Sequence, residues 1–268
     1  MIFFAGHPLL MWVVLAGVGA LVSFINSISG GGSVLSLPLL VLLGLPASEA
    51  NGTNRLGIWL GSLGSSVGFW RKGMVYPAMT LRAAVPGAVG SVLGSLVGIS
   101  LPEALFKPVL AAVILFVVFE TLRPKRMPAG VKGSNVEGLF LRSGWIPFLV
   151  YMAIGFYGGF LQAGSGLIMM YAFSRLSNLN LIQINVLKVS NTFLFITVSL
   201  LIYGWYGKVR WDMAIALALG NALGGFTGSV LQVRKGEGFV RIFFAVSGSA
   251  LALKLFYDAV YAMARSYF

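Results

Sequence analysis

The sequence contains no cysteine, one histidine and only seven carboxylates among its 268 residues. The absence of thiols excludes disulfides, thiolate zinc sites and iron–sulfur clusters. The few other ligands leave little from which to build a different metal site, so we expect no metal and no cofactor. Charged residues are also scarce: they make up 10% of the chain, against about 25% in a typical soluble domain.

Apolar residues take their place, at 58% of the chain, in repeated runs long enough to cross a hydrocarbon core of about 30 Å. This composition excludes a soluble enzyme and predicts an all-α integral membrane protein. The net charge of +12 could indicate nucleic-acid binding, but most cations lie in short loops between apolar runs, as in inner-membrane proteins. We therefore expect a multi-pass protein of the cell (inner) membrane, with the lipid bilayer and not nucleic acid as its partner.

The apolar runs form two groups of five, separated by a polar stretch. We predict a first transmembrane repeat over 1–122, a basic linker over 123–144 and a second repeat over 145–268. The second segment of each group has about twelve residues and reaches about 18 Å as a helix, too short to span alone. The segments lie near 8–28, 34–45, 48–69, 79–99 and 104–121, and then near 145–163, 166–176, 181–205, 212–231 and 238–263.

The two groups also match residue by residue, at an offset of about 134 to 137. Thr53 and Asn54 correspond to Ser190 and Asn191 at the same depth in the third segment of each group. The stripes Gly90-Gly94-Gly98 and Gly220-Gly224-Gly228 also correspond, and small residues every four positions are typical of close helix packing. The order of these matches predicts an internal duplication.

The linker indicates the topology, because cytoplasmic loops are rich in Lys and Arg. Its five cations face a single carboxylate, Glu137, so we expect it to be cytoplasmic. The two halves have opposite orientations in the membrane if each short segment crosses it, and parallel orientations if each short segment re-enters. The distribution of loop cations favours neither arrangement strongly. We favour inverted halves, because transporters commonly join such repeats around a midplane site. The cations are Arg123, Lys125, Arg126, Lys132 and Arg142.

A glycine-rich break precedes each short segment, at 29–33 and 162–166. Backbone that leaves a helix at membrane depth is tolerated where it is buried or lines a cavity, and glycine permits sharp turns and close approach to a ligand. The helix after each break presents a partial positive end. Two such ends could hold one anion, although the glycines could instead serve only packing. The binding residues predicted here are Gly30, Gly31, Gly32, Ser33, Gln162, Ser165 and Gly166.

A polar cluster with a cation occurs in the third segment of each group. A charge at the bilayer centre costs about 2.5–3.5 kcal/mol on insertion scales, and neither segment has a carboxylate in its middle. We therefore expect the transported anion to be the partner, with Arg55 as the main cation; snorkelling toward the nearer face is the alternative. The binding residues predicted here are Thr53, Asn54, Arg55, Lys188, Ser190 and Asn191.

These motifs resemble those of the TauE/SafE family of sulfite and organosulfonate exporters, also called the toluene sulfonate uptake permease family. The resemblance depends on the glycines at 30–32, on Pro38 and Gly44, and on the run Ala-Asn-Gly-Thr-Asn at 50–54. A degenerate second copy, from Gly155 to Asn191, lacks the proline. The resemblance implies a permease, often an exporter, for small sulfur-containing anions such as sulfite, organosulfonates or thiosulfate.

We therefore expect a membrane permease for a small sulfur-containing oxyanion, bound near the midplane between the glycine-rich breaks. An anion channel or a small-molecule receptor would use similar residues and is the alternative, and a homo-oligomer is compatible with each. An intramembrane enzyme would need a nucleophile–base pair or a metal cluster. The residues offer neither, so we expect no catalytic activity.

Overall fold

The computed structural model describes residues 8–102, 104–106, 108–109, 112 and 140–236. The predicted segment at 238–263 and most of those at 104–121 and 123–144 lie outside them. The described helices are α1 (Pro8–Ile28), α2 (Ser33–Leu42), α3 (Ala47–Trp70), α4 (Pro77–Ser100), α6 (Trp145–Phe160), α7 (Ser165–Leu176), α8 (Leu181–Trp205) and Trp211–Gly236.

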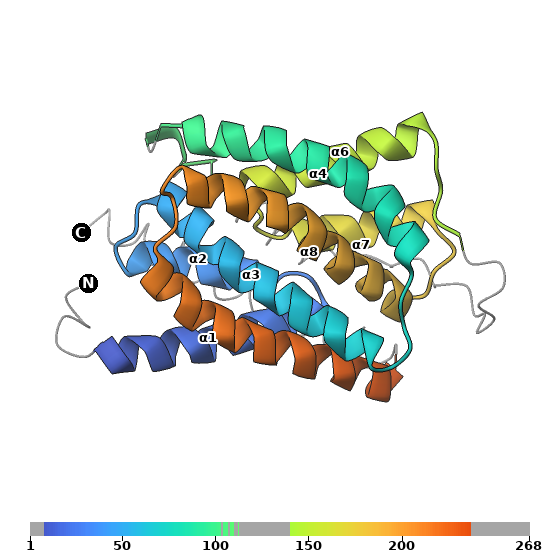
Figure 1. The fold of residues 1–268 in the computed structure, drawn as a ribbon, viewed down its shortest axis with the longest axis horizontal. Coiled ribbons are helices and arrows are strands. Elements are labelled where there is room, and N and C mark those ends of the chain that lie inside the picture. Colours follow the sequence, from blue (N-terminus) through green and yellow to red (C-terminus); the bar gives the residue numbers. More distant parts are fainter. Residues whose placement is uncertain (1–7, 103, 107, 110–111, 113–139, 237–268) are drawn as a thin grey trace, which may run out of the picture.

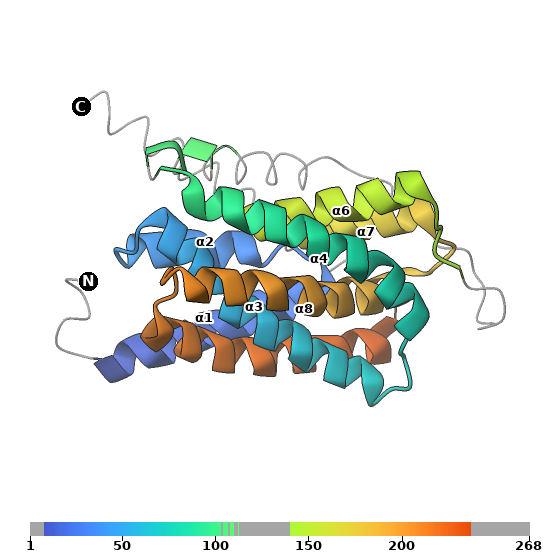
Figure 2. The same ribbon diagram turned by 45° about the horizontal axis from the view of Figure 1, so that its top comes forward.

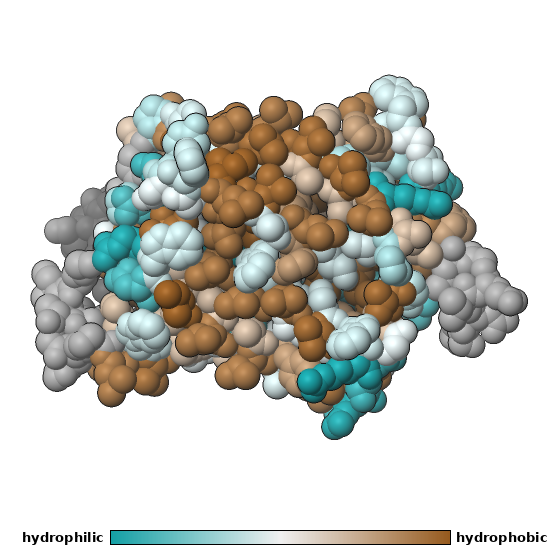
Figure 3. All heavy atoms as spheres, viewed as in Figure 1, coloured by the Kyte–Doolittle hydropathy of each residue, from teal (hydrophilic) through white to brown (hydrophobic). Residues whose placement is uncertain are grey.

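Four of these helices are long and apolar enough to cross a membrane: Leu9–Ile28, Pro77–Ser100, Leu181–Trp205 and Trp211–Gly236. Many large apolar side chains on their outer faces are exposed, Leu223 by 68%. Figure 3 shows them as a broad apolar band across the middle of the molecule, with hydrophilic groups gathered toward both ends. The described residues contain no strand, only an isolated bridge between Leu141 and Ser177. The predicted all-α membrane protein is confirmed.

Each short helix turns back along the helix that precedes it. Leu40, near the end of α2, clusters with Leu15 in the first half of α1. At the other end of the chain, the Arg142 amide before α6 donates a hydrogen bond to the Leu176 carbonyl at the end of α7, at 2.8 Å. We call the two pairs the α1–α2 hairpin and the α6–α7 hairpin, and the turns at 29–32 and 161–164 their tips. Each hairpin begins and ends at the same end of the bundle (Figures 1 and 2).

The two hairpins open toward opposite ends of the molecule. In Figure 1, α1 begins at the left and α6 begins at the right, while α3, α4, α8 and Trp211–Gly236 run between the two ends. Our reasoning from the sequence tied opposite orientation to short segments that cross, and re-entry to parallel halves. That link was wrong, because it counted the short helix alone. A hairpin that returns as a whole makes no net crossing, so re-entry is compatible with opposed halves.

The hairpin of each half packs against the fourth helix of the other half. A methyl group at Gly90 of α4 would lie 1.9 Å from the Met152 carbonyl oxygen of α6, and one at Gly220 would lie 1.8 Å from the Ala16 carbonyl oxygen of α1. Backbones can approach this closely only where side chains are absent. The glycine stripes therefore serve helix packing, as predicted, and they interlock the two halves.

Candidate functional site

The two hairpin tips meet inside the molecule. Gly30 has a φ of 83°, and a methyl group there would lie 2.6 Å from the carbonyl carbon of Gly166. The Gly164 amide donates a hydrogen bond to Ser33 Oγ at 3.2 Å. The glycine-rich breaks, more than 130 residues apart in the chain, therefore lie in direct backbone contact, which requires glycine at both positions.

A small pocket lies beside this contact. Its cavity volume is about 30 Å³, which is enough for roughly two or three water molecules or for a ligand of a few atoms. Residues from both hairpins and from α3 and α8 line it. The lining residues are Gly30, Ser33, Gln162, Ser165 and Gly166 at the tips, and Ser23, Asn26, Ser27, Ile58, Gly61, Ser62, Ser65, Lys188, Val189 and Thr192 on the helices.

Lys188 is the one charged side chain among these lining residues. Its ammonium group donates hydrogen bonds to the carbonyl oxygens of Asn26 (2.7 Å) and Ser27 (3.2 Å) and to Asn185 Oδ1 (2.7 Å). All three acceptors are neutral, so no carboxylate cancels the charge. The N-termini of α2 and α7 also lie at the tips, where free backbone N–H groups can donate hydrogen bonds to an anion. The pocket therefore has the electrostatics of a site for a small anion.

Gln162 is an unusual lining residue. It is the one non-glycine residue with positive φ, 65°, in the described part of the chain, a conformation that costs an L-residue roughly 1–2 kcal/mol. Its side chain is 2% exposed, and its Oε1 has no hydrogen-bond partner among the described residues. Strained backbone and an unsatisfied buried amide gather at ligand sites, so Gln162 is a candidate ligand contact.

Arg55 lies outside the pocket lining, fully buried. Its guanidinium donates hydrogen bonds to the carbonyl oxygens of Gly158, at 3.1 Å, and Gly159, and stacks 4.0 Å over the Tyr203 ring. Carbonyls at a helix C-terminus carry partial negative charge. The sequence led us to expect an anion as its partner, but in the structure the end of α6 compensates the charge.

Lys188 and Arg55 occupy related positions in the two halves. Arg55, on α3 of the first half, binds the C-terminal carbonyls of α6, and Lys188, on α8 of the second half, binds those of α1. We call these contacts the crossed caps, because each half supplies the cation that satisfies the hairpin of the other. Only the Lys188 cap borders the pocket.

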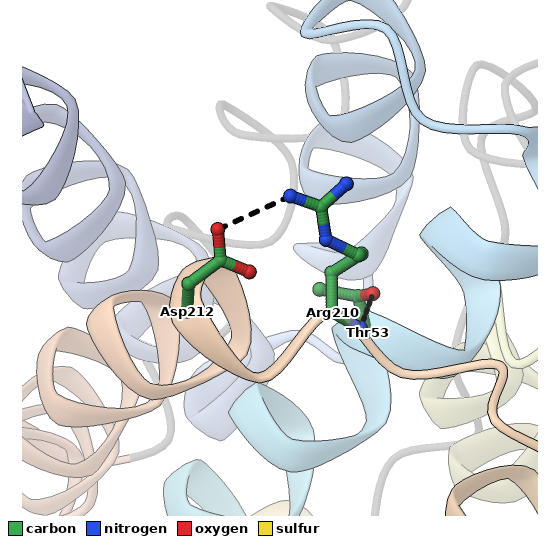
Figure 4. Close-up of polar contacts among 3 residues, drawn as sticks. All are labelled: Thr53, Arg210 and Asp212. Atoms are coloured by element: carbon green, nitrogen blue, oxygen red, sulfur yellow. Dashed lines mark hydrogen bonds and ion pairs between the residues drawn. The ribbon is translucent and has the colours of Figure 1, made fainter.

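Thr53 holds a loop and does not face the pocket. Its Oγ1 accepts a hydrogen bond from the Arg210 amide at 3.0 Å, and the Arg210 side chain pairs with Asp212 at 3.3 Å. Figure 4 shows this chain of contacts between α3 and the start of the helix Trp211–Gly236. The adjacent Gly52 supports the same loop, because a methyl group there would lie 1.9 Å from the Lys208 carbonyl oxygen.

Five further residues of the predicted site lie outside the lining. A methyl group at Gly32 would lie 2.1 Å from the Val22 carbonyl oxygen, so this glycine lets the α1–α2 hairpin close. Asn191 Nδ2 donates to the Leu187 carbonyl of its own helix at 2.9 Å. The structure thus brings six of the thirteen predicted residues to one pocket. The five are Gly31, Gly32, Asn54, Ser190 and Asn191.

The sequence analysis missed lining residues on α1, α3 and α8. They follow a detectable pattern, because small or polar residues recur at intervals of three and four within apolar segments, which places them on one helix face. The described residues contain no group of three His, Asp or Glu side chains able to hold a metal ion. The missed polar positions are Ser23, Asn26, Ser27, Ser62, Ser65 and Thr192.

Comparisons with known proteins were made over the whole chain. The sequence model of the family described as "Sulfite exporter TauE/SafE" matches residues 15–255. A "Probable membrane transporter protein" of Haemophilus influenzae is 29% identical over 245 residues, which cover 91% of this chain and 94% of that protein. The "Probable membrane transporter protein YfcA" of Escherichia coli K12 is 27% identical over 259 residues, covering 96% and 93%. No solved structure matches the chain significantly.

Proposed function

The chain belongs to the TauE/SafE sulfite exporter family, and from this premise we propose that it exports a small sulfur-containing oxyanion such as sulfite or an organosulfonate. Its relatives are probable membrane transporters, and four of its helices are able to cross a membrane. The substrate would bind in the pocket beside the hairpin tips and leave the cell after the pocket opens to the outside.

The pocket lining is the observation that supports this proposal. It combines one uncancelled cation, Lys188, with several hydroxyl groups and two helix N-termini, and its described residues include no carboxylate. Oxyanions are bound by such fixed donors, and hydrogen bonds to charged groups contribute about 1.5–3 kcal/mol each. A site at the contact between two repeats, formed by broken helices, is also typical of secondary transporters.

We assign the binding roles according to which residues line this pocket. Lys188 supplies the charge, while Ser33, Ser165 and the Gln162 amide orient the oxygens of the anion. Arg55, which the sequence suggested as the main cation, instead stabilises the end of α6 next to the site. Its role for the substrate is indirect, through the position of the α6–α7 tip.

We place the protein in the inner membrane as two inverted repeats, 1–122 and 145–268, joined by a cytoplasmic linker over 123–144. Two observations support this arrangement. The hairpins open toward opposite ends of the molecule, and the loop between α3 and α4, with Arg71 and Lys72, lies at the same end as the start of α6, which the basic linker precedes. That end carries the cations expected of a cytoplasmic face.

Proteoliposomes loaded with labelled sulfite test the function directly. Wild-type protein should release the label, and Lys188→Met should lower sulfite affinity by roughly ten- to a hundredfold, since about 1.5–3 kcal/mol is lost. Lys188→Arg keeps the charge and the cap on α1, and should retain more activity than Lys188→Met. Lys72→Met, which removes an exposed loop cation, is the matched control and should behave as wild type.

The outcome also separates a carrier from the alternatives. Sulfite transport by Lys188→Met at the wild-type rate, in protein of normal melting temperature, would remove Lys188 from the site. Binding without any release of label would favour a receptor. Unitary currents in planar bilayers would favour an anion channel, because a carrier moves only a few ions in each conformational cycle.

A further inference from the structure

We infer that the pocket takes its ligand as a compact monoanion and rejects dianions of similar size, so that hydrogensulfite and not the sulfite dianion is the bound species. This inference rests on the proposed function and specifies the substrate of the same site. It depends on how many fixed charges line the pocket and on how little room the pocket has.

The charges can be counted element by element. The described lining residues from α1, α3 and the two tips are serines, glycines, amides and one isoleucine, and α8 adds a valine, a threonine and Lys188. Lys188 is therefore the one titratable group that faces the ligand from any element of the lining. Arg55 lies outside the lining, bound to the α6 carbonyls and stacked on Tyr203, so it does not face a second negative charge on the ligand.

Helix ends do not change this count. The positive N-termini of α2 and α7 lie at the tips, but so do the negative C-termini of α1 and α6, only a few residues away along the chain. Each helix end is equivalent to about half an elementary charge, and at each tip the two ends are of opposite sign. The lining thus provides close to a single net positive charge.

A single positive charge favours a singly charged ligand. The free energy lost when an ion leaves water grows with the square of its charge, so a dianion loses about four times as much hydration free energy as a monoanion of the same size. The attraction to fixed cations and dipoles grows only linearly, and therefore about doubles. A bound monoanion leaves the pocket neutral, whereas a bound dianion leaves one buried negative charge without a partner.

The Gln162 amide points to the same species. Its Oε1 is a buried acceptor without a partner among the described residues. A fully deprotonated oxyanion offers only acceptors and cannot satisfy it, whereas a protonated oxyanion carries a donor. The cavity volume is only about 30 Å³. The pocket therefore excludes bulky organic groups and favours the smallest monoanions.

Binding to the purified wild-type protein in detergent, measured by calorimetry at several pH values, tests the inference without any variant. Three probes suffice: sulfite, which loses its second proton near neutral pH; methanesulfonate, a monoanion throughout; and sulfate, a dianion throughout. Above the second pKa of sulfite, its affinity should fall by up to about tenfold for each pH unit. Methanesulfonate affinity should stay constant, and sulfate should bind at least about tenfold more weakly than methanesulfonate.

Each other result contradicts the inference in an identifiable way. Sulfite affinity that is constant or rises with pH would show that the dianion is accepted, as would sulfate binding equal to that of methanesulfonate. An equal fall for sulfite and methanesulfonate would place the titration in the protein. In these cases transport of labelled sulfite would still support the proposed function. If none of the three probes binds and no label is transported, the proposed function fails together with the inference.

Discussion

Replacing Gly30 with alanine should separate the two hairpin tips. Gly30 has a φ of 83°, and the left-handed conformation costs an alanine roughly 1–2 kcal/mol. The new methyl group would also lie 2.6 Å from the Gly166 backbone, which cannot move aside as a flexible side chain can. Overpacking of this kind costs about 1–3 kcal/mol, so we expect Gly30→Ala to lose about 2–5 kcal/mol of stability.

Gly31 provides the matched control, one residue further along the same tip. Its φ is not positive, and a methyl group there would meet only a Leu167 methyl group, at 3.8 Å, which is an ordinary contact. Gly31→Ala should therefore change the stability by no more than about 0.5 kcal/mol. The two variants have the same composition and differ only in where the methyl group is placed.

The assay is the apparent melting temperature of both variants in detergent, followed by sulfite binding to the folded fraction. Gly30→Ala should melt well below the wild type and bind sulfite more weakly, because Gly30 and Gly166 line the pocket. Gly31→Ala should match the wild type in both measurements. Equal melting temperatures for the two variants would show that the tips are not in backbone contact, and the description of the site would then be wrong.

Three further predictions concern the crossed caps and the topology. Arg55→Ala removes two charge-assisted hydrogen bonds and should lose about 3–5 kcal/mol of stability, measured by thermal melting, while sulfite affinity of the folded fraction falls less than in the lysine variant above. Tyr203→Phe keeps the ring under Arg55 but removes the hydroxyl that accepts from Asn51 at 2.9 Å, and should lose about 1–2 kcal/mol in the same assay. Single cysteines at the exposed Lys72 and Tyr206, which follow the ends of α3 and α8 at opposite ends of the bundle, should react with an impermeant maleimide from opposite sides of the membrane.

Each of these has its own control. Arg55→Lys should recover part of the stability, because the charge survives and the planar fork does not. Tyr206→Phe changes an exposed tyrosine and should melt as the wild type does. Labelling of both cysteines from one side would contradict the opposed ends. If sulfite affinity falls more in Arg55→Ala than in Lys188→Met, Arg55 and not Lys188 is the main cation that binds the substrate.

The sequence was sufficient for features that depend on local pattern. Two helices, Pro8–Ile28 and Leu181–Trp205, begin and end at the predicted residues, because apolar runs and polar breaks are properties of neighbouring residues. The two short helices begin one residue before the predicted starts, after glycines at 32 and 164, and α2 ends at Leu42, three residues before the predicted end. Small residues at fixed spacing also predicted correctly that the glycine stripes serve close packing.

The partners of the buried cations could not be read in this way. Arg55 binds carbonyl groups 103 and 104 residues further along the chain, and any residue type can supply a backbone carbonyl. A search for carboxylates or for a ligand therefore overlooks such a partner. The direction of the short helices was equally hidden, because a twelve-residue apolar helix has the same pattern whether it crosses or returns.

The crossed caps constrain the order in which this protein can mature. The ribosome synthesises α1, α2 and α3 before α6. Arg55 therefore enters the bilayer before the α6 carbonyl groups that it binds in the folded protein. The end of α1 likewise has no cation until Lys188 is made, 161 and 162 residues after the carbonyl groups that it binds. The end of α6 therefore has its cation available as soon as it is inserted, whereas the end of α1 gains its cap only after α8 has been inserted.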